Sequence, residues 1–177
     1  MSDEKRTKQP AIRPSALPWL WLSVLVVAVD QITKRMIIAR FELYERIEVW
    51  SLLDITRLHN TGAAFSFLSD ASGWQRWFFI ILGFIVASLV TIWLSRLPRF
   101  EHKSLAIGLS LVVGGAIGNV IDRISLGYVV DFVHFHYGQW YFPAFNVADS
   151  AITVGAVILL VQSILSDDDK IGSSRHE

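Results

Sequence analysis

Long apolar runs dominate the chain, and most of its polar residues lie between these runs or at their ends. Three runs, over residues 77–94, 105–121 and 147–165, approach the roughly 20 residues that a helix needs to cross a bilayer. A fourth run, over 17–38, carries Asp30 and Lys34 in its second half. The pattern predicts an all-α membrane protein with four transmembrane helices.

The first run admits a second interpretation. It follows a basic stretch, as the apolar core of a secretory signal peptide does. No good small-x-small cleavage site follows it, and three further spans do, which favours an uncleaved helix.

The segment 40–76 has too much pattern for a simple linker. Residues 45–50 partly alternate and 52–58 are rich in branched side chains, as short strands are. Residues 59–62 predict a turn. The apolar stretch 63–68 is too short to span the bilayer, so an interfacial sheet or a short re-entrant piece fits.

A second segment between spans, 129–142, is rich in aromatic residues and has a turn signal at 137–139, which predicts a small hairpin. Its aromatic side chains either anchor the protein at the interface or grip acyl chains, and anchoring is the commoner use. We therefore expect a small β-rich segment at the outer membrane face.

Basic residues set the predicted orientation. They flank the start of the chain and fill the connection 96–103, and the positive-inside rule places such segments in the cytoplasm. Four arginines in the first outer segment weaken the bias. The predicted organisation is a cytoplasmic tail over 1–16, one membrane domain over 17–165 with outer segments 40–76 and 123–146, and a cytoplasmic tail over 166–177.

Composition narrows the function classes. The chain is 53% hydrophobic, with a mean hydropathy of +0.44, which is too apolar for an ordinary soluble domain. A net charge of zero argues against nucleic acid as a partner. Because cysteine is absent, disulfides, thiolate nucleophiles and Cys-ligated metals are excluded. We expect a monomer that uses no metal and no other cofactor.

Two aspartates at the edge of the membrane-spanning runs, Asp131 and Asp149, are the strongest candidates for chemistry. A carboxylate near hydrocarbon is costly, and such residues mark functional sites. They are either separate solvated charges, with Asp149 capping the last helix, or a pair that shares one proton. A pair of this kind can act as base and acid on an amide carbonyl.

Other polar residues gather at the same ends of the spans. Asn119, Asp122 and Arg123 end the third span after Gly114 and Gly118, whose spacing predicts close helix packing. Arg123 has Asp122, Asp30, a lipid phosphate or a substrate carbonyl as possible partners.

Asp30 and Lys34 are four residues apart, and an internal ion pair that braces the outer segment is favoured for them. His134 and His136 alternate as in a strand. Without a third ligand they are expected to be interfacial histidines and not metal ligands.

Five stretches together resemble the bacterial lipoprotein signal peptidases, also called signal peptidase II. They occur in the family's order over residues 30–150: Asp30-Gln31-Ile32-Thr33-Lys34, Asn60-Thr61-Gly62-Ala63-Ala64-Phe65-Ser66, Gly114-Gly115-Ala116-Ile117-Gly118-Asn119-Val120-Ile121-Asp122-Arg123, Val129-Val130-Asp131-Phe132 and Phe145-Asn146-Val147-Ala148-Asp149-Ser150.

The resemblance implies an aspartyl endopeptidase of the bacterial inner membrane. It would cut the signal peptide from prolipoproteins just before a diacylglyceryl-modified cysteine, near the periplasmic face, and would bind the antibiotic globomycin. The catalytic pair would be Asp131 and Asp149, and the residues that line the site or position the substrate would be Asn60, Gly62, Asn119, Arg123 and Asn146.

Two other functions fit part of the pattern. A small proton- or solute-translocating protein would use the same aspartates as carriers, but its polar residues would be spread through the depth of the bilayer. Here they lie at one end of the spans. A noncatalytic scaffold would assemble partners through the glycine-rich span.

Overall fold

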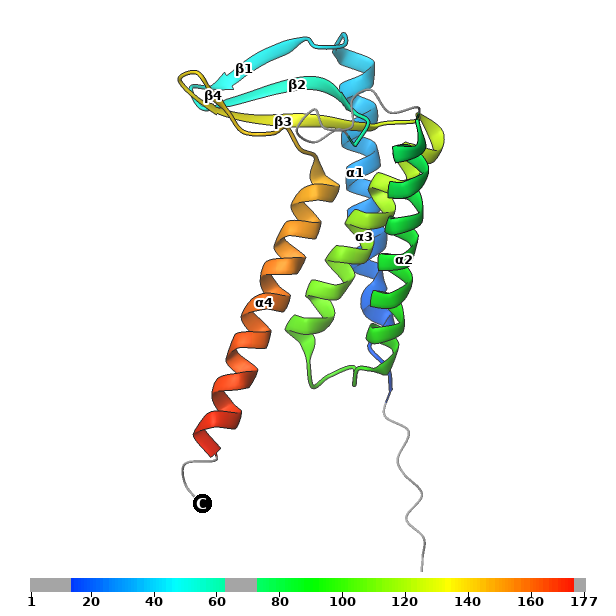
Figure 1. Cartoon of the computed structure of the whole chain (residues 1–177), viewed down its shortest axis with the longest axis vertical. Coiled ribbons are helices and arrows are strands. Elements are labelled where there is room, and N and C mark those ends of the chain that lie inside the picture. Colours follow the sequence, from blue (N-terminus) through cyan, green and yellow to red (C-terminus); the bar gives the residue numbers. More distant parts are fainter. Residues whose placement is uncertain (1–13, 63–72, 174–177) are drawn as a thin grey trace, which may run out of the picture.

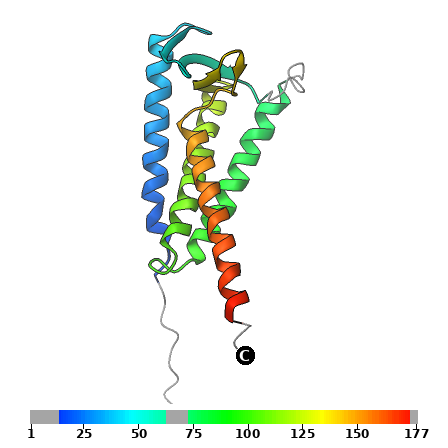
Figure 2. The same ribbon diagram turned by 90° about the vertical axis from the view of Figure 1, so that its left-hand side faces the viewer.

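The computed structural model describes residues 14–62 and 73–173. Four long helices form a bundle, and a four-stranded sheet lies across one end of it (Figure 1). We call this end the sheet end and the opposite one the far end. Figure 2 shows that all four helices run between the two ends.

The helices begin and end at the signals that the sequence carries. A short 3-10 turn with Pro18 leads into α1 (Leu20–Arg40), and α2 (Trp74–Arg96) begins after Gly73, whose φ of 84° favours glycine. Helix α3 (Lys103–Ser125) ends shortly before Gly127, and α4 (Val147–Ser173) begins directly after Asn146.

Helix α3 is the centre of the bundle and packs against α1, α2 and α4. Of its apolar stretch 67% is buried, against 17% for those of α2 and α4. Small residues allow the close approach: a Cβ on Gly114 would lie 2.9 Å from the Ser23 carbonyl oxygen of α1, and one on Gly115 would overlap the Ala148 carbonyl oxygen of α4. The packing role predicted for Gly114 and Gly118 is therefore confirmed, since a Cβ on Gly118 would also lie 2.8 Å from Asp30 Oδ2 and 3.2 Å from Ala148 Cβ.

Within residues 14–62 and 73–173, three helices are long and apolar enough to cross a membrane: α2, α3 and the Val147–Leu165 part of α4. Helix α1 is equally long, but Asp30, Lys34 and Arg35 interrupt its apolar character. Asp30 and Lys34 are fully buried inside the bundle, at 0% and 2% exposure. The membrane character of three helices follows from their length and composition, and a fourth span remains a prediction.

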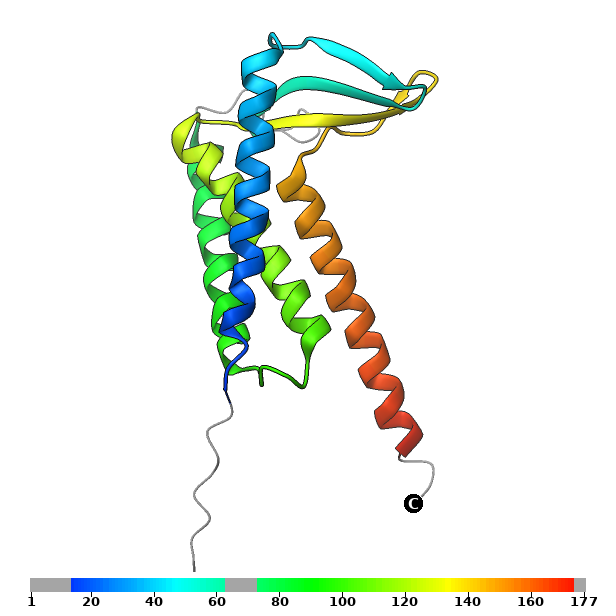
Figure 3. The same ribbon diagram turned by 180° about the vertical axis from the view of Figure 1, so that it is seen from behind.

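The sheet confirms the strands predicted for both connecting segments. Its order is β1 (Arg46–Trp50), β2 (Leu53–Asn60), β3 (Val129–Tyr137) and β4 (Trp140–Tyr141), all antiparallel. In Figure 3 the strands run crosswise to the helices, and the β3–β4 hairpin reaches past α4.

One boundary differs from the prediction. His59 and Asn60, expected in a turn, form the last two residues of β2, because they pair with Val130 and Val129 of β3. The chain turns only after them, near Gly62. The short apolar stretch predicted at 63–68 lies outside the described residues.

Candidate active site

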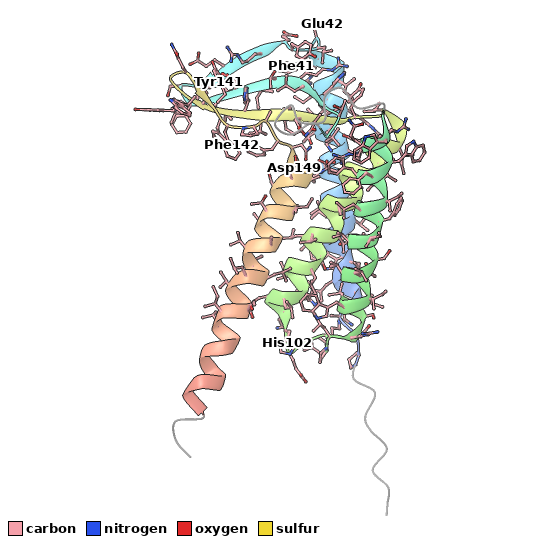
Figure 4. All side chains as sticks on the ribbon, in the orientation of Figure 1. Phe41, Glu42, His102, Tyr141, Phe142 and Asp149 are labelled. Atoms are coloured by element: carbon pink, nitrogen blue, oxygen red, sulfur yellow. The ribbon has the colours of Figure 1, made fainter. Side chains whose placement is uncertain are left out.

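Asp131 and Asp149 come together beneath the sheet, from two different kinds of element. Asp131 lies on β3 and is 3% exposed. Asp149 lies in the first turn of α4 and is partly buried (Figure 4). The carboxyls are joined through the amide groups of three asparagines, Asn60, Asn119 and Asn146.

Each carboxyl receives short hydrogen bonds from these amides. Asn60 Nδ2 donates to Asp131 Oδ2 at 2.9 Å, and Asn146 Nδ2 donates to Asp131 Oδ1 at 2.7 Å. Asn119 Nδ2 donates to Asp149 Oδ1 at 2.7 Å, and its own Oδ1 accepts a bond from Asn146 Nδ2 at 3.3 Å. The two aspartates therefore belong to one continuous hydrogen-bond network.

A β-bulge puts Asn60 within reach of Asp131. In the β2–β3 ladder, Ile55 faces Val133, but Leu58 faces Asp131, so β2 holds one extra residue between them. Side chains alternate between the faces of a sheet, and a shift of one residue therefore moves all later side chains to the other face. With the bulge, Asn60 lies on the same face as Asp131 as its diagonal neighbour.

Gly62 holds Asn60 in place. Its backbone N–H donates to Asn60 Oδ1 at 2.8 Å, which leaves the amide nitrogen of Asn60 directed at Asp131. The φ of Gly62 is 93°, and a Cβ there would collide with the ring of Phe79 on α2. Only glycine suits this position.

Asp149 does cap α4, as one interpretation of the sequence predicted. Asn146 Oδ1 accepts the Asp149 N–H at 2.9 Å, and Asp149 Oδ2 accepts the Asn146 N–H at 3.3 Å. This reciprocal arrangement resembles a capping box. The cap uses Oδ2 of Asp149, and Oδ1 accepts the bond from Asn119. Asp149 therefore caps the helix and also belongs to the aspartate network.

The environment of Asp131 favours its protonated form. Burial, followed by the negative charge of Asp149, raises the pKa of Asp131 from 3.8 to about 7. The hydrogen bonds from Asn60 and Asn146 and the charge of Lys34 act in the opposite direction but do not offset burial. A proton shared by the two carboxyls therefore resides on the Asp131 side near neutral pH.

The ion pair predicted for Asp30 and Lys34 is present, at 2.8 Å, and Asp122 joins it at 3.1 Å from Lys34 Nζ. The cluster ties α1 to α3 deep in the bundle. Gln31 also belongs to it and was missed by sequence reasoning: its Nε2 donates to Asp122 Oδ1 at 2.8 Å and to the Gly118 carbonyl at 3.3 Å. Its spacing of three from Lys34, on one helix face, was a usable signal.

Arg123 forms no ion pair with Asp122 or Asp30 within the described ranges. Its guanidinium lies 4.8 Å from the centre of the Phe79 ring, and Nη1 donates to the Asn119 carbonyl at 3.5 Å. Asp122 is instead occupied by Lys34 and Gln31. Arg123 thus lies beside the aspartate network, next to the same aromatic ring that limits Gly62.

His134 and His136 lie on β3 and form no contact with Asp131 or Asp149 among those found in the described residues. The His134 ring lies 5.1 Å from that of Tyr141, and His136 Nε2 lies 3.3 Å from Asp54 Oδ1. In residues 14–62 and 73–173 no three His, Cys, Asp or Glu side chains are grouped to hold a metal ion.

Comparison with known proteins decides the family. A family model described as signal peptidase (SPase) II matches residues 22–165, which include all the site residues named above. The chain belongs to the signal peptidase II family. It is therefore a peptidase, and the family is one of membrane proteins.

Individual relatives agree over most of the chain. A lipoprotein signal peptidase of Shewanella woodyi is 51% identical over 152 residues, covering 86% of each chain. One of Pseudomonas aeruginosa is 51% identical over 162 residues, covering 90% of this chain and 94% of that protein. A solved structure described as a bacterial membrane enzyme is 29% identical, with a TM-score of 0.73, and covers 90% of this chain and 95% of its own.

Proposed function

We propose that the protein is an aspartyl endopeptidase of the bacterial inner membrane that cleaves diacylglyceryl-modified prolipoproteins just N-terminal to the modified cysteine. Membership of the signal peptidase II family supports removal of signal peptides from prolipoproteins. The observation that carries the catalytic assignment is the asparagine network that joins Asp131 to Asp149.

The two carboxyls have unequal environments, which suits a division of labour. Asp131, with a pKa of about 7, starts as the protonated acid, and Asp149 starts as the ionised base. Asp149 removes a proton from water as the water oxygen attacks the scissile carbonyl carbon, and Asp131 gives its proton to the carbonyl oxygen.

The second half of the reaction restores both groups. Asp149 gives its new proton to the amide nitrogen, and the carbon–nitrogen bond breaks. Asp131 takes back a proton as the carbonyl reforms, so the products are a carboxylic acid and a free amine. The asparagines hold both carboxyls in fixed directions through these transfers, a more immediate role than the substrate contact predicted for them.

The location of the network suits a lipid-modified substrate. The network lies at the sheet end, where the β3–β4 hairpin exposes Tyr137, Trp140 and Phe142. Aromatic residues of this kind favour the membrane interface. We expect the substrate to approach laterally with its acyl chains in the periplasmic leaflet, both termini to be cytoplasmic, and globomycin-type inhibitors to occupy the same site.

A translocating protein is the alternative, and the arrangement of polar groups argues against it. Such a protein needs polar residues through the depth of the membrane. The charged network here stays near the sheet end. Toward the far end the buried cluster is apolar, with Leu94, Ala106 and Leu109, and the buried polar groups beside it are the uncharged hydroxyls of Ser23 and Ser110. Transport would also predict no peptide-bond cleavage.

The decisive experiment uses the reconstituted protein and a diacylglyceryl-modified prolipoprotein, with cleavage followed by mobility shift. We expect Asp131→Asn and Asp149→Asn each to lose at least about 10³-fold in activity, and the double variant to be little worse, because members of one catalytic unit are not additive. Asp54→Asn is the matched control, since Asp54 is an equally buried acid of the same sheet, paired with Arg46 at 3.4 Å.

The pH dependence of the rate tests the assignment of Asp131 as the acid. Because Asp131 must carry its proton, the rate should fall as pH rises through about 7, where that proton is lost.

Two outcomes would contradict the proposal. Near-normal turnover of either Asp131→Asn or Asp149→Asn would refute the catalytic pair. A rate that is constant from pH 5 to pH 9, with chemistry rate-limiting, would contradict the shared proton.

A further inference from the structure

The Lys34 ammonium connects, through two carboxylates, to the backbone beside both aspartates. Gln31 Nε2 bridges the same carboxylates, at 3.3 Å from Asp30 Oδ2 and 2.8 Å from Asp122 Oδ1, but carries no charge. Its ammonium has three donors, and three acceptors surround it: Asp30 Oδ2 at 2.8 Å, Asp122 Oδ2 at 3.1 Å and Asn119 Oδ1 at 3.1 Å. The side chain is 2% exposed. Each proton of the ammonium thus has a partner, which a buried charge requires.

The two carboxylates carry the connection onward in the same way. Asp30 Oδ1 accepts the N–H of Ala148 at 2.9 Å, and Asp122 Oδ2 accepts the N–H of Val130 at 3.1 Å. Ala148 directly precedes Asp149, and Val130 directly precedes Asp131. Two chains of polar contacts, which we call arms, therefore lead from one ammonium to the residues that precede Asp149 and Asp131.

The third hydrogen bond of the ammonium leads to the carboxyl of Asp149 through the side chain of Asn119. Lys34 binds the amide oxygen of Asn119, which orients the amide nitrogen toward Asp149 Oδ1, 2.7 Å away. If that amide were reversed, its NH₂ group would face the ammonium and its oxygen would face the carboxylate. Lys34 therefore fixes which way Asn119 points.

We propose that Lys34 is a positioning residue of the reaction, which sets the separation and direction of Asp131 and Asp149 through Asp30, Asp122 and Asn119. This inference rests on the proposed function. A catalytic pair is sensitive to displacements of about 1 Å, which can cost about 10²-fold in rate even when they originate away from the chemistry. A three-armed anchor shared by α1, α3, β3 and α4 limits such displacements.

The charge of Lys34 predicts an effect on the pH–rate profile that a purely structural role would not produce. That charge lowers the pKa of Asp131, against burial and the charge of Asp149. The other charged or titratable groups near the pair are Asp30 on α1, Asp122 and Arg123 on α3, and His59 on β2. Removing the ammonium should therefore move the alkaline limb of the pH–rate profile to higher pH.

The test compares Lys34→Met with wild type in the reconstituted full-length protein, using the diacylglyceryl-modified prolipoprotein. We expect kcat to fall about 10²-fold, with KM within about threefold, and the alkaline limb to shift upward. Ser23→Ala is the matched control: Ser23 Oγ also ties α1 to α3, at 2.6 Å from the Ser110 carbonyl, but it has no connection to the aspartates. Ser23→Ala should change neither kcat nor the pH of the alkaline limb.

Because Lys34→Met leaves two buried carboxylates without their cation, Lys34→Met/Asp30→Asn is measured beside it. The double variant keeps the net charge of the cluster and an acceptor for the Ala148 N–H, but lacks the ammonium that binds Asp122 and Asn119, while Gln31 still donates to Asp122. We expect the same loss of kcat. Wild-type kcat in either folded variant, or a loss of kcat in Lys34→Met without a shift of the alkaline limb, would overturn the inference.

If both variants fail to fold, Lys34 serves folding alone, and the inference is overturned as well. Failure of the catalytic proposal looks different. It would appear as activity in Asp131→Asn or Asp149→Asn, whereas failure of the present inference leaves those variants inactive and Lys34→Met active.

Discussion

The two ends of the helix bundle are stabilised by different interactions. At the sheet end, Asp30, Lys34, Asp122 and the three asparagines form a continuous polar network in which charges and amides have partners. At the far end, Leu94, Ala106 and Leu109 pack with Ala16 in an apolar cluster. At the sheet end, the directional hydrogen bonds of charged and amide side chains orient the site. The far end is held by close apolar contact and by a few bonds to backbone carbonyls, such as that of Ala16 N–H to Leu97.

The central helix shows both modes along its length. Toward the far end, α3 meets α4 through glycines, with Gly108 against Gly155. Near the sheet end, it meets the same helix through Gly115 and then through Asn119. Changes toward the far end should therefore alter stability alone, and changes near the sheet end should alter the reaction as well.

Outside the aspartate pair, the largest effect that separates the two ends is expected at Asn146, the residue bonded to both aspartates. Asn146→Ala removes the donor to Asp131 Oδ1 and the cap of α4. We expect a loss of about 10²-fold in kcat from misplacement of the pair, and a stability loss of about 0.5–2 kcal/mol from the missing cap. Cleavage kinetics and thermal unfolding in detergent measure the two effects.

Thr153→Ala is the matched control for that change. Its hydroxyl lies one turn further along α4 and donates only to the Asp149 carbonyl, at 2.8 Å. It should stay within twofold of wild type. An equal loss of kcat in both variants would mean that the start of α4 is merely sensitive to substitution.

A smaller effect is expected at Gly62. In Gly62→Ala the new Cβ meets the Phe79 ring and the left-handed backbone is strained, by about 1–2 kcal/mol. Asn60 should then turn away from Asp131, and kcat should fall up to about tenfold, because a hydrogen bond between uncharged groups is worth about 0.5–1.5 kcal/mol.

Gly73→Ala separates backbone strain from loss of the site contact. Gly73 has a similar φ of 84°, and a Cβ there would meet nothing within 4 Å. It should lose stability through its backbone but keep its kcat. If kcat fell equally in Gly73→Ala, the orientation of Asn60 would not be the cause.

The smallest effect on the reaction is expected toward the far end. In Gly155→Ala the Cβ would lie 2.7 Å from the Gly108 carbonyl oxygen and 2.8 Å from Val112 Cγ2. We expect a stability loss of about 1–3 kcal/mol from overpacking, with kcat of the folded protein within twofold. Thermal unfolding and cleavage rate are measured on the same preparation.

Gly115→Ala makes the same substitution on the same helix pair near the sheet end, where the Cβ would overlap the carbonyl of Ala148, beside Asp149. Here stability and kcat should fall together. If the two glycine variants behaved alike in kcat, the contrast between the two ends of the bundle would be lost.

Much of the fold was predictable because its signals are local. Apolar runs of the length of a span locate α2, α3 and α4, and branched residues locate β1 and β2. The aspartate pair and the Asp30–Lys34 ion pair were also predictable, because charged residues are rare in such runs. The turn at 59–62 was placed too early, since local turn signals cannot register the pairing of His59 and Asn60 with β3.

Most elements, the family motifs and the candidate acids could be inferred from the amino-acid sequence, because they depend on residue type and spacing along the chain. That Asn60 faces Asp131, that Arg123 lies over Phe79, and that Lys34 reaches the backbone beside both aspartates became visible only in the folded chain. The physical reason is that these contacts join residues far apart in the chain. Their geometry depends on a single-residue bulge, which leaves no local signal, and on the exact distance between packed helices, which the spacing of glycines indicates but does not fix.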